Sequence, residues 1–221
     1  MPAGNHLPQS LQQALLLPGA QLQAVTLSES DLRLWLMQLE NPEVELGFRD
    51  IERLWQALPY WAFAWAGGQA LAAWIRRNPQ AVAGKRVLDF GCGSGIAGIA
   101  AGLAGAREVW MADLDSNALT AACENARLNG IDVQCVEGDW PEVDVLLAAD
   151  VLYDISSSAD LRTLMMQIPQ WLLAETRFVA PDFVDLECLG TDTWATLPRI
   201  GDFDEAVEVE IYCRAGQSPL V

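Results

Sequence analysis

A glycine-rich turn behind a short apolar run is the part of this sequence best suited to binding chemistry. The stretch VLDFGCGSG covers residues 87–95 and carries Gly91, Gly93 and Gly95 at every second position. Glycine tolerates positive φ and lets the backbone pass close to a ligand. The run that begins at Ile96 predicts a helix whose first N–H groups face the same ligand. The turn therefore predicts a site for a nucleotide-like cofactor.

Two classes of cofactor compete for this turn. Residues 93–98 satisfy the dinucleotide pattern G-x-G-x-x-G, and Asp113 follows at the distance expected of a ribose-binding acid. However, Asp89 ends the preceding run, and Gly91 opens the turn before that pattern begins. A carboxylate repels a pyrophosphate but attracts an ammonium or sulfonium group. The residues therefore favour S-adenosylmethionine, with a dinucleotide-dependent oxidoreductase as the alternative.

Acidic residues also follow the later apolar runs. Asp113 is expected to accept hydrogen bonds from both ribose hydroxyls, and Asp139 to bind the adenine amino group. Trp140 would then pack on the adenine ring, although an ordinary core aromatic is the alternative interpretation. A further acid, Asp150, follows the next run. Ligands of open α/β sheets bind beyond the carboxyl ends of the strands, so we expect these acids on one edge.

The order of apolar runs predicts an α/β fold. The runs lack strict alternation, which is typical of strands covered on both faces, and hence of a doubly wound, mostly parallel Rossmann-like sheet. An N-terminal, partly helical extension (1–49) precedes the main domain (50–221), and no assignment is made for 185–200. The expected helices are 31–39, 68–77, 94–105, 116–129 and 160–174, and the expected strands are 86–90, 108–112, 132–137, 143–149, 177–180 and 207–214, the last antiparallel.

Composition narrows the class of protein. Five cysteines without a C-x-x-C pair predict reduced thiols and a cytoplasmic location. The one histidine, His6, lies near the N-terminus, so no metal site is expected. There is no signal-peptide pattern at the start. The uncharged stretch 58–75 contains Pro59 and a Gly67-Gly68 pair, which favours a buried segment over a membrane span.

The chain is strongly acidic. Its net charge is −17, and residues 85–221 hold 23 of the 30 acidic residues but only 8 of the 13 basic ones. Such a surface repels nucleic-acid phosphates, so no nucleic-acid partner is expected. It serves either as a solubility device or to steer a basic protein substrate.

Four segments together resemble a known enzyme family, the class I (seven-stranded) methyltransferases. These segments are 59–75 (PYWAFAWAGGQALAAWI), 87–95, 112–115 (ADLD) and 150–153 (DVLY). Within the family they are similar to the lysine methyltransferases of the electron transfer flavoprotein β subunit, and more distantly to the ribosomal protein L11 methyltransferases. The resemblance implies S-adenosylmethionine as cofactor and a protein substrate, with the electron transfer flavoprotein β subunit as the candidate. A ribosomal protein or a small molecule is the alternative acceptor.

The resemblance also implies roles for individual residues. Trp65 would lie against the cofactor, with Gly67 and Gly68 allowing close approach. Asp150 and Tyr153 would line the pocket of the methyl acceptor and form the catalytic pair. The alternative is that Asp150 caps a helix while Tyr153 belongs to the core.

Overall fold

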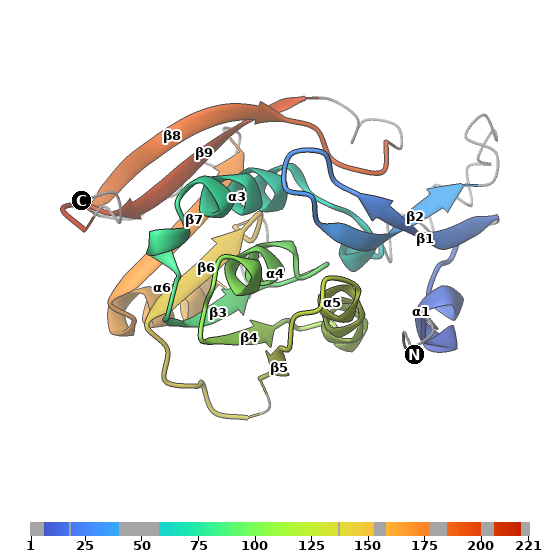
Figure 1. The fold of residues 1–221 in the computed structure, drawn as a ribbon, viewed down its shortest axis with the longest axis horizontal. Helices are drawn as coiled ribbons and strands as arrows, with labels where there is room; N and C mark the ends of the chain where they lie inside the picture. Colours follow the sequence, from blue (N-terminus) through green and yellow to red (C-terminus); the bar gives the residue numbers. More distant parts are fainter. Residues whose placement is uncertain are drawn as a thin grey trace.

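A central seven-stranded sheet organises the fold (Figure 1). The computed structural model describes residues 7–17, 19–39, 58–136, 138–152, 158–176, 185–199 and 206–217. The strand order is β5-β4-β3-β6-β7-β9-β8. The strands are β3 (Arg86–Phe90), β4 (Glu108–Ala112), β5 (Gln134–Cys135), β6 (Val145–Ala149), β7 (Gln170–Thr176), β8 (Leu186–Trp194) and β9 (Val207–Arg214).

Five of these strands run parallel, as the sequence predicts. β3 pairs in parallel with β4 and β6, β4 with β5, and β6 with β7. β9 returns antiparallel between β7 and β8, which confirms the antiparallel assignment of 207–214. The mostly parallel, Rossmann-like sheet is therefore confirmed.

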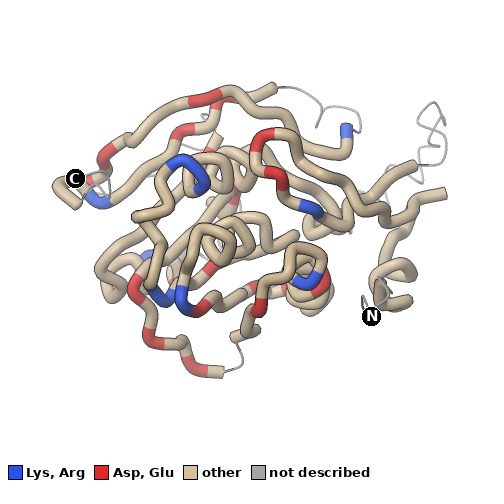
Figure 2. Tube along the Cα trace, viewed as in Figure 1, with Lys and Arg blue, Asp and Glu red and all other residues tan. Residues whose placement is uncertain are grey.

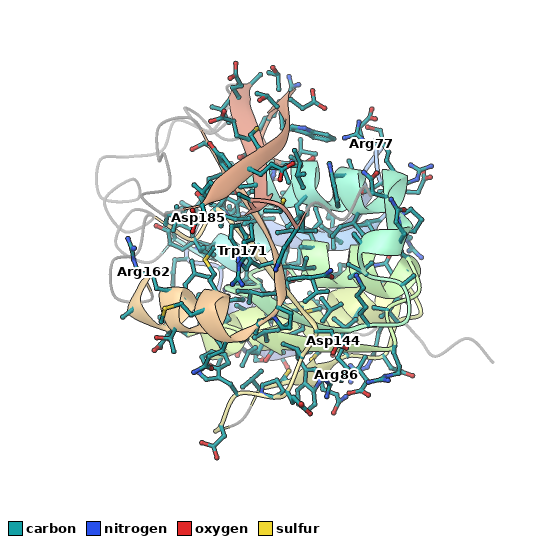
Figure 3. The ribbon with its side chains drawn as sticks, turned by 90° about the vertical axis from the view of Figure 1, so that its left-hand side faces the viewer. Arg77, Arg86, Asp144, Arg162, Trp171 and Asp185 are labelled. Carbon is teal, nitrogen blue, oxygen red and sulfur yellow. The ribbon has the colours of Figure 1, made fainter. Side chains whose placement is uncertain are left out.

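Helices cover both faces of the sheet. α3 (Ala66–Arg77), α4 (Ile96–Leu103) and α5 (Ser116–Leu128) lie on one face, whose core includes Leu71, Ile99 and Ala122. α6 (Ser158–Gln167) packs Leu161 and Leu164 against the other face. Figure 3 shows the sheet between these layers, with Arg162 of α6 on one side and Arg77 of α3 on the other. Two short 3₁₀ helices, η1 (Tyr60–Ala62) and η2 (Pro79–Ala81), flank α3.

The N-terminal segment corrects one prediction. Residues 31–39 do not form a helix: β2 (Arg33–Leu39) pairs antiparallel with β1 (Ala20–Thr26), after a short helix α1 (Gln9–Gln13). Leucines at every second position, Leu32, Leu34 and Leu36, are buried, and this period of two suits a strand. The hairpin packs on α5. The proposed boundary at 49/50 lies outside the described residues and stays a prediction.

A second correction concerns the expected helix at 160–174. α6 ends at Gln167, and β7 already occupies Gln170–Thr176. Pro169 disfavours helical backbone in the residue before it and so separates the two elements. Trp171, which is labelled in Figure 3, and Leu172 are both buried. The strand expected at 177–180 lies outside the described residues.

The uncharged stretch 58–75 forms η1 and most of α3. Its side chains are largely buried, including Trp61, Phe63 and Leu71. In the described part of the chain, no helix is long and apolar enough to cross a membrane.

Candidate functional site

A cavity of about 720 Å³ lies at the carboxyl ends of the parallel strands. It lies next to β3, which has β4 on one side and β6 on the other. The order in which the chain adds strands to the sheet reverses at β3, and ligands of open α/β sheets bind at such a point. Its lining includes the ends of four strands, at Asp89, Asp113, Asp150 and Glu175. The volume is in the range of small-molecule sites.

The glycine turn forms one wall of the cavity and requires glycine at its bends. Gly91 has φ 65° and Gly95 has φ 77°, both in the left-handed region. A Cβ on Gly91 would lie 2.6 Å from Cγ1 of Val151. Gly93 also has positive φ and lines the cavity. Gly95 is the N-cap of α4, so this helix begins at the cavity, as predicted.

Asp89 is the last residue but one of β3, close to this turn in the sequence. Its side chain is 2 % exposed, and Oδ2 accepts a hydrogen bond from the Gly98 N–H at 2.8 Å. Burial raises the pKa of Asp89 to about 7, although the Gly98 hydrogen bond opposes that rise. A cation at the cavity wall would stabilise the charged form of this carboxyl.

Asp113 follows β4 and holds the turn in place. Its Oδ2 accepts the Gly93 N–H and its Oδ1 the Asp115 N–H, both at 2.9 Å. Burial raises the pKa of Asp113, and the backbone hydrogen bonds partly offset this. The side chain is half-buried and lines the cavity, so it is placed to meet hydroxyl groups of a ligand. Asp115 caps α5 by accepting the Asn117 N–H at 2.8 Å.

The two residues expected at the adenine differ in placement. Trp140 lines the cavity with 41 % of its surface exposed, and its ring centroid lies 5.8 Å from that of Phe90. It is therefore open to a planar ligand rather than sealed in the core. Asp139 is exposed and is not among the lining residues of the described part. Its contact with the adenine stays a prediction.

Trp65 lies at the start of α3 and lines the cavity, and its contact with the cofactor stays a prediction. Its Nε1–H donates to the carbonyl oxygen of Tyr60 at 2.9 Å, and its ring packs near those of Tyr60 and Phe63. These contacts fix the orientation of the indole. Gly68 lines the cavity one turn further along.

Asp150 connects the cavity to α3. Its Oδ2 accepts the Gly67 N–H at 2.8 Å and the Gly68 N–H at 3.2 Å, so the carboxylate caps the first turn of the helix. The backbone of Asp150 has φ 52°, which directs the chain sharply after β6. Burial raises the pKa of Asp150 to about 6, against the effect of the two hydrogen bonds. The residue thus caps a helix and lines the cavity at once. Tyr153 lies outside the described residues.

Glu175 was not predicted from the sequence. Its side chain is 2 % exposed but belongs to the cavity lining, and Oε1 accepts the N–H groups of Val151 at 2.9 Å and Leu152 at 3.2 Å. Burial, followed by the Asp150 charge, raises the pKa of Glu175 to about 8. The sequence did contain a signal for Glu175, since it is the acid that ends the apolar run WLLAE. This run was not recognised as a strand because most of it was assigned to the helix expected at 160–174.

The charge of the lining decides which ligand fits. Among the described lining residues six are acidic and none is Lys, Arg or His; the acids are Asp89, Asp113, Asp115, Asp150, Asp160 and Glu175. Figure 2 shows how few basic positions the trace carries. Arg86 pairs with Asp144 at 2.9 Å, at the opposite ends of the strands (Figure 3). A pyrophosphate would find no cation here, whereas the sulfonium and ammonium groups of S-adenosylmethionine fit the acidic lining.

Sequence comparisons agree with this geometry. Residues 73–178 match the family model of the ribosomal protein L11 methyltransferase (PrmA). The electron transfer flavoprotein β subunit lysine methyltransferase of Danio rerio is 42% identical over 105 residues, which are 43% of this chain and 40% of the relative. The human protein of that name is 38% identical over 102 residues, 43% of this chain and 39% of the relative. The chain thus spans less than half the length of these relatives.

Shorter sequence matches and solved structures add two further comparisons. The ribosomal protein L11 methyltransferase of Dichelobacter nodosus is 48% identical over 75 residues, 32% of this chain and 26% of the relative. Among solved structures, a proposed RNA methyltransferase from Pyrococcus horikoshii superposes with a TM-score of 0.53 at 18% identity, covering 68% of this chain and 83% of that one. A proposed methyltransferase from Streptococcus mutans gives 0.53 at 13% identity, covering 89% and 56%.

Proposed function

We propose that this protein is a protein-lysine N-methyltransferase, built on residues 73–178, which form a class I methyltransferase domain with S-adenosylmethionine as its cofactor. The names of the relatives suggest the electron transfer flavoprotein β subunit as a candidate substrate. The match to the L11 methyltransferase model makes ribosomal protein L11 the second candidate. The five cysteines, none of them in a disulfide, support a reducing compartment such as the cytosol.

The observation that carries the proposal is the acidic lining of the cavity, which includes Asp150. S-adenosylmethionine supplies a methyl group activated by a sulfonium. The protein must hold the acceptor nitrogen in line with that group and exclude water. Asp150, with Trp65 and Gly68 beside it in the lining, offers an anion to a cationic side chain. A lysine satisfies this requirement, whereas an anionic acceptor would be repelled.

A bound lysine must also lose a proton. At pH 7 this costs about 4–5 kcal/mol for a group with a pKa of about 10.4. The Asp150 carboxylate attracts the ammonium and for that reason raises its pKa. Asp150 is therefore suited to aligning the amine and unsuited to activating it. Tyr153, next in the D-x-x-Y pattern, remains a proposed partner of the nitrogen on the family resemblance alone.

The test is a transfer assay with S-adenosylmethionine carrying a labelled methyl group. Purified electron transfer flavoprotein β subunit and ribosomal protein L11 are offered separately, each also in a form whose lysines have been blocked by acetylation. We expect label on a lysine of one unblocked protein, located by mass spectrometry. Label confined to small molecules would contradict the proposal.

Asp150→Asn distinguishes the charge of Asp150 from its capping role. The asparagine keeps an oxygen for the Gly67 and Gly68 N–H groups but lacks the charge. We expect kcat/KM for the lysine acceptor to fall by about tenfold or more, since alignment is lost. Affinity for S-adenosylhomocysteine, measured by calorimetry, should change by less than twofold. An unchanged kcat/KM would mean that Asp150 only caps the helix.

A further inference from the structure

Two carboxyl groups that line the cavity come from the carboxyl ends of neighbouring strands. Ala149 of β6 and Ala174 of β7 are paired in register, so the residues that follow them, Asp150 and Glu175, emerge side by side. The Asp150 N–H donates to the Ala174 carbonyl at 3.0 Å, which keeps the strand ends together. Both side chains line the cavity.

The two carboxyls are held differently. Oδ2 of Asp150 accepts two N–H groups from the first turn of α3, an arrangement that favours the ionised form. Glu175 is almost completely buried, accepts two N–H groups of the turn after β6, and faces the Asp150 charge. Burial and this like charge raise the pKa of Glu175 to about 8. Of the two, Glu175 therefore holds a proton more readily.

We propose that Glu175 receives the proton that the acceptor ammonium must lose before methyl transfer. This rests on the proposed lysine specificity. An N–H bond of the ammonium breaks, its electron pair remains on nitrogen as the lone pair, and an O–H bond forms on the Glu175 carboxylate. Asp150 stays anionic and aligns the amine. The proton afterwards leaves Glu175 for water in the open part of the cavity.

The match of acidities supports this step. A lysine ammonium has a pKa of about 10.4, whereas an ordinary glutamate has one of about 4.3. Proton transfer is efficient when the base has a pKa near the working pH. A Glu175 pKa of about 8 brings the carboxyl close to that condition. A solvent-exposed glutamate in the same place would be a far weaker base.

Two other acidic side chains are less suited to this role. Asp160 of α6 also lines the cavity, but its side chain is exposed to solvent. Glu210 of β9 lies opposite Glu175 in register, but its Oε2 accepts the hydroxyl of Tyr212 at 2.7 Å, and Glu210 is not a lining residue. The backbone N–H groups of Val151 and Leu152 are donors only. No described lining residue is Lys, Arg or His.

Glu175→Gln is the test variant, with Glu210→Gln as its matched control. The glutamine keeps an oxygen for the Val151 and Leu152 N–H groups but cannot take up the proton. We expect kcat for the lysine acceptor to fall by about 10²- to 10³-fold. Affinity for S-adenosylhomocysteine should change by less than twofold, which shows that the variant is folded. Glu210→Gln should keep kcat within twofold of wild type.

The pH profile separates proton transfer from mere positioning. For wild type, log(kcat/KM) should rise as Glu175 loses its proton and should level off by about pH 9. The plateau arises because the reaction needs Glu175 deprotonated and the lysine still protonated, and this combination is most abundant between the two pKa values. For Glu175→Gln, log(kcat/KM) should keep rising by one unit per pH unit towards the lysine pKa of about 10.4. Glu175→Asp, which keeps a carboxyl, should recover at least tenfold of the lost kcat.

The possible outcomes separate the two proposals. Wild-type activity on lysine with an unchanged Glu175→Gln rate or profile overturns the role of Glu175 alone. Equal losses in Glu175→Gln and Glu175→Asp, with wild-type profiles, also overturn it, because Glu175 would then only position the turn. A wild-type protein that methylates no lysine overturns the proposed function, and this inference with it.

Discussion

At the scale of single residues, Asp150 and Gly67 constrain each other. The Gly67 N–H donates to the Asp150 carboxylate at 2.8 Å, and a Cβ at position 67 would lie 2.6 Å from both carboxylate oxygens. Glycine is required here for space, since its φ is not in the left-handed region. The close approach of helix and carboxylate is what brings the start of α3 to the cavity.

We expect Gly67→Ala to displace the Asp150 carboxylate. The added methyl group should lower the free energy of unfolding by about 1–3 kcal/mol. It should also lower methyl transfer more strongly than cofactor affinity. Urea unfolding and a transfer assay measure the two effects. Gly190→Ala in β8 is the control, because a Cβ there meets nothing within 4 Å. Equal behaviour of the two variants would contradict this interpretation.

Prediction of single site residues from the sequence succeeded best where an acidic residue directly follows an apolar run. Asp89, Asp113 and Asp150 each follow an apolar run, and the structure brings all three to the cavity. Asp139 has the same position in the pattern, yet the two-residue β5 ends before it and leaves it exposed. Sequence alone does not show how far a strand extends, so it could not separate Asp139 from the others.

At the scale of elements, Asn125 of α5 links the N-terminal hairpin to the glycine turn. Its Oδ1 accepts the Trp35 N–H of β2 at 2.7 Å, and its Nδ2 donates to the Ser94 carbonyl at 2.8 Å. The side chain is fully buried. Asn129, one turn later, binds the N–H and carbonyl of Arg33 at 3.0 and 2.7 Å and donates to the Asn125 carbonyl at 2.7 Å, and it makes no hydrogen bond to the glycine turn in the described part of the chain. The hairpin is thereby connected to the cofactor wall of the cavity.

Replacing these two asparagines should separate stability from cofactor binding. Asn125→Ala leaves a buried N–H and a buried carbonyl without partners, at a cost of about 2–4 kcal/mol in the free energy of unfolding. It should also weaken S-adenosylhomocysteine binding at least several-fold, because the Ser94 carbonyl is released. Asn129→Ala should destabilise the protein but leave that affinity within twofold. Calorimetry measures the affinity of both variants for S-adenosylhomocysteine. Equal affinities would contradict the link between the hairpin and the cofactor wall.

Element prediction failed where a local signal competed with the packing. The segment 31–39 was expected to be helical, but the alternating leucines of β2 need a partner strand for their burial. That partner, β1, has the weakly patterned sequence AQLQAVT. Similarly, the apolar residues of 160–174 continue across Pro169. A one-dimensional pattern does not reveal that α6 and β7 belong to different layers.

At the scale of the whole molecule, buried acids make stability depend on pH. The pKa values of Asp89, Asp150 and Glu175 are raised to about 7, 6 and 8 in the folded protein. The unfolded chain releases these protons near pH 4. Between pH 4 and the raised pKa values of the folded protein, unfolding therefore releases protons. Raising the pH in this range favours the unfolded state. Asp144, with a pKa lowered to about 2 beside Arg86, acts oppositely but only in strong acid.

We therefore expect the free energy of unfolding to fall as the pH rises from about 5 to about 8. The fall should amount to several kcal/mol, because all three carboxyls keep their protons to a higher pH in the folded protein than in the unfolded chain. Urea titrations at several pH values measure it. Glu175→Gln should flatten the upper part of the curve, whereas Glu210→Gln should not. Stability that rises over this range would contradict the assignment of buried, proton-holding carboxyls.

The bond between Gly67 and Asp150 joins residues 83 positions apart, and it has a consequence for biosynthesis. A ribosome delivers α3 and the glycine turn well before β6 and β7 leave the exit tunnel. During that interval the first turn of α3 has no carboxylate to accept its N–H groups. The segments that carry the glycine turn and the start of α3 are thus synthesised well before the strand ends that carry Asp150 and Glu175.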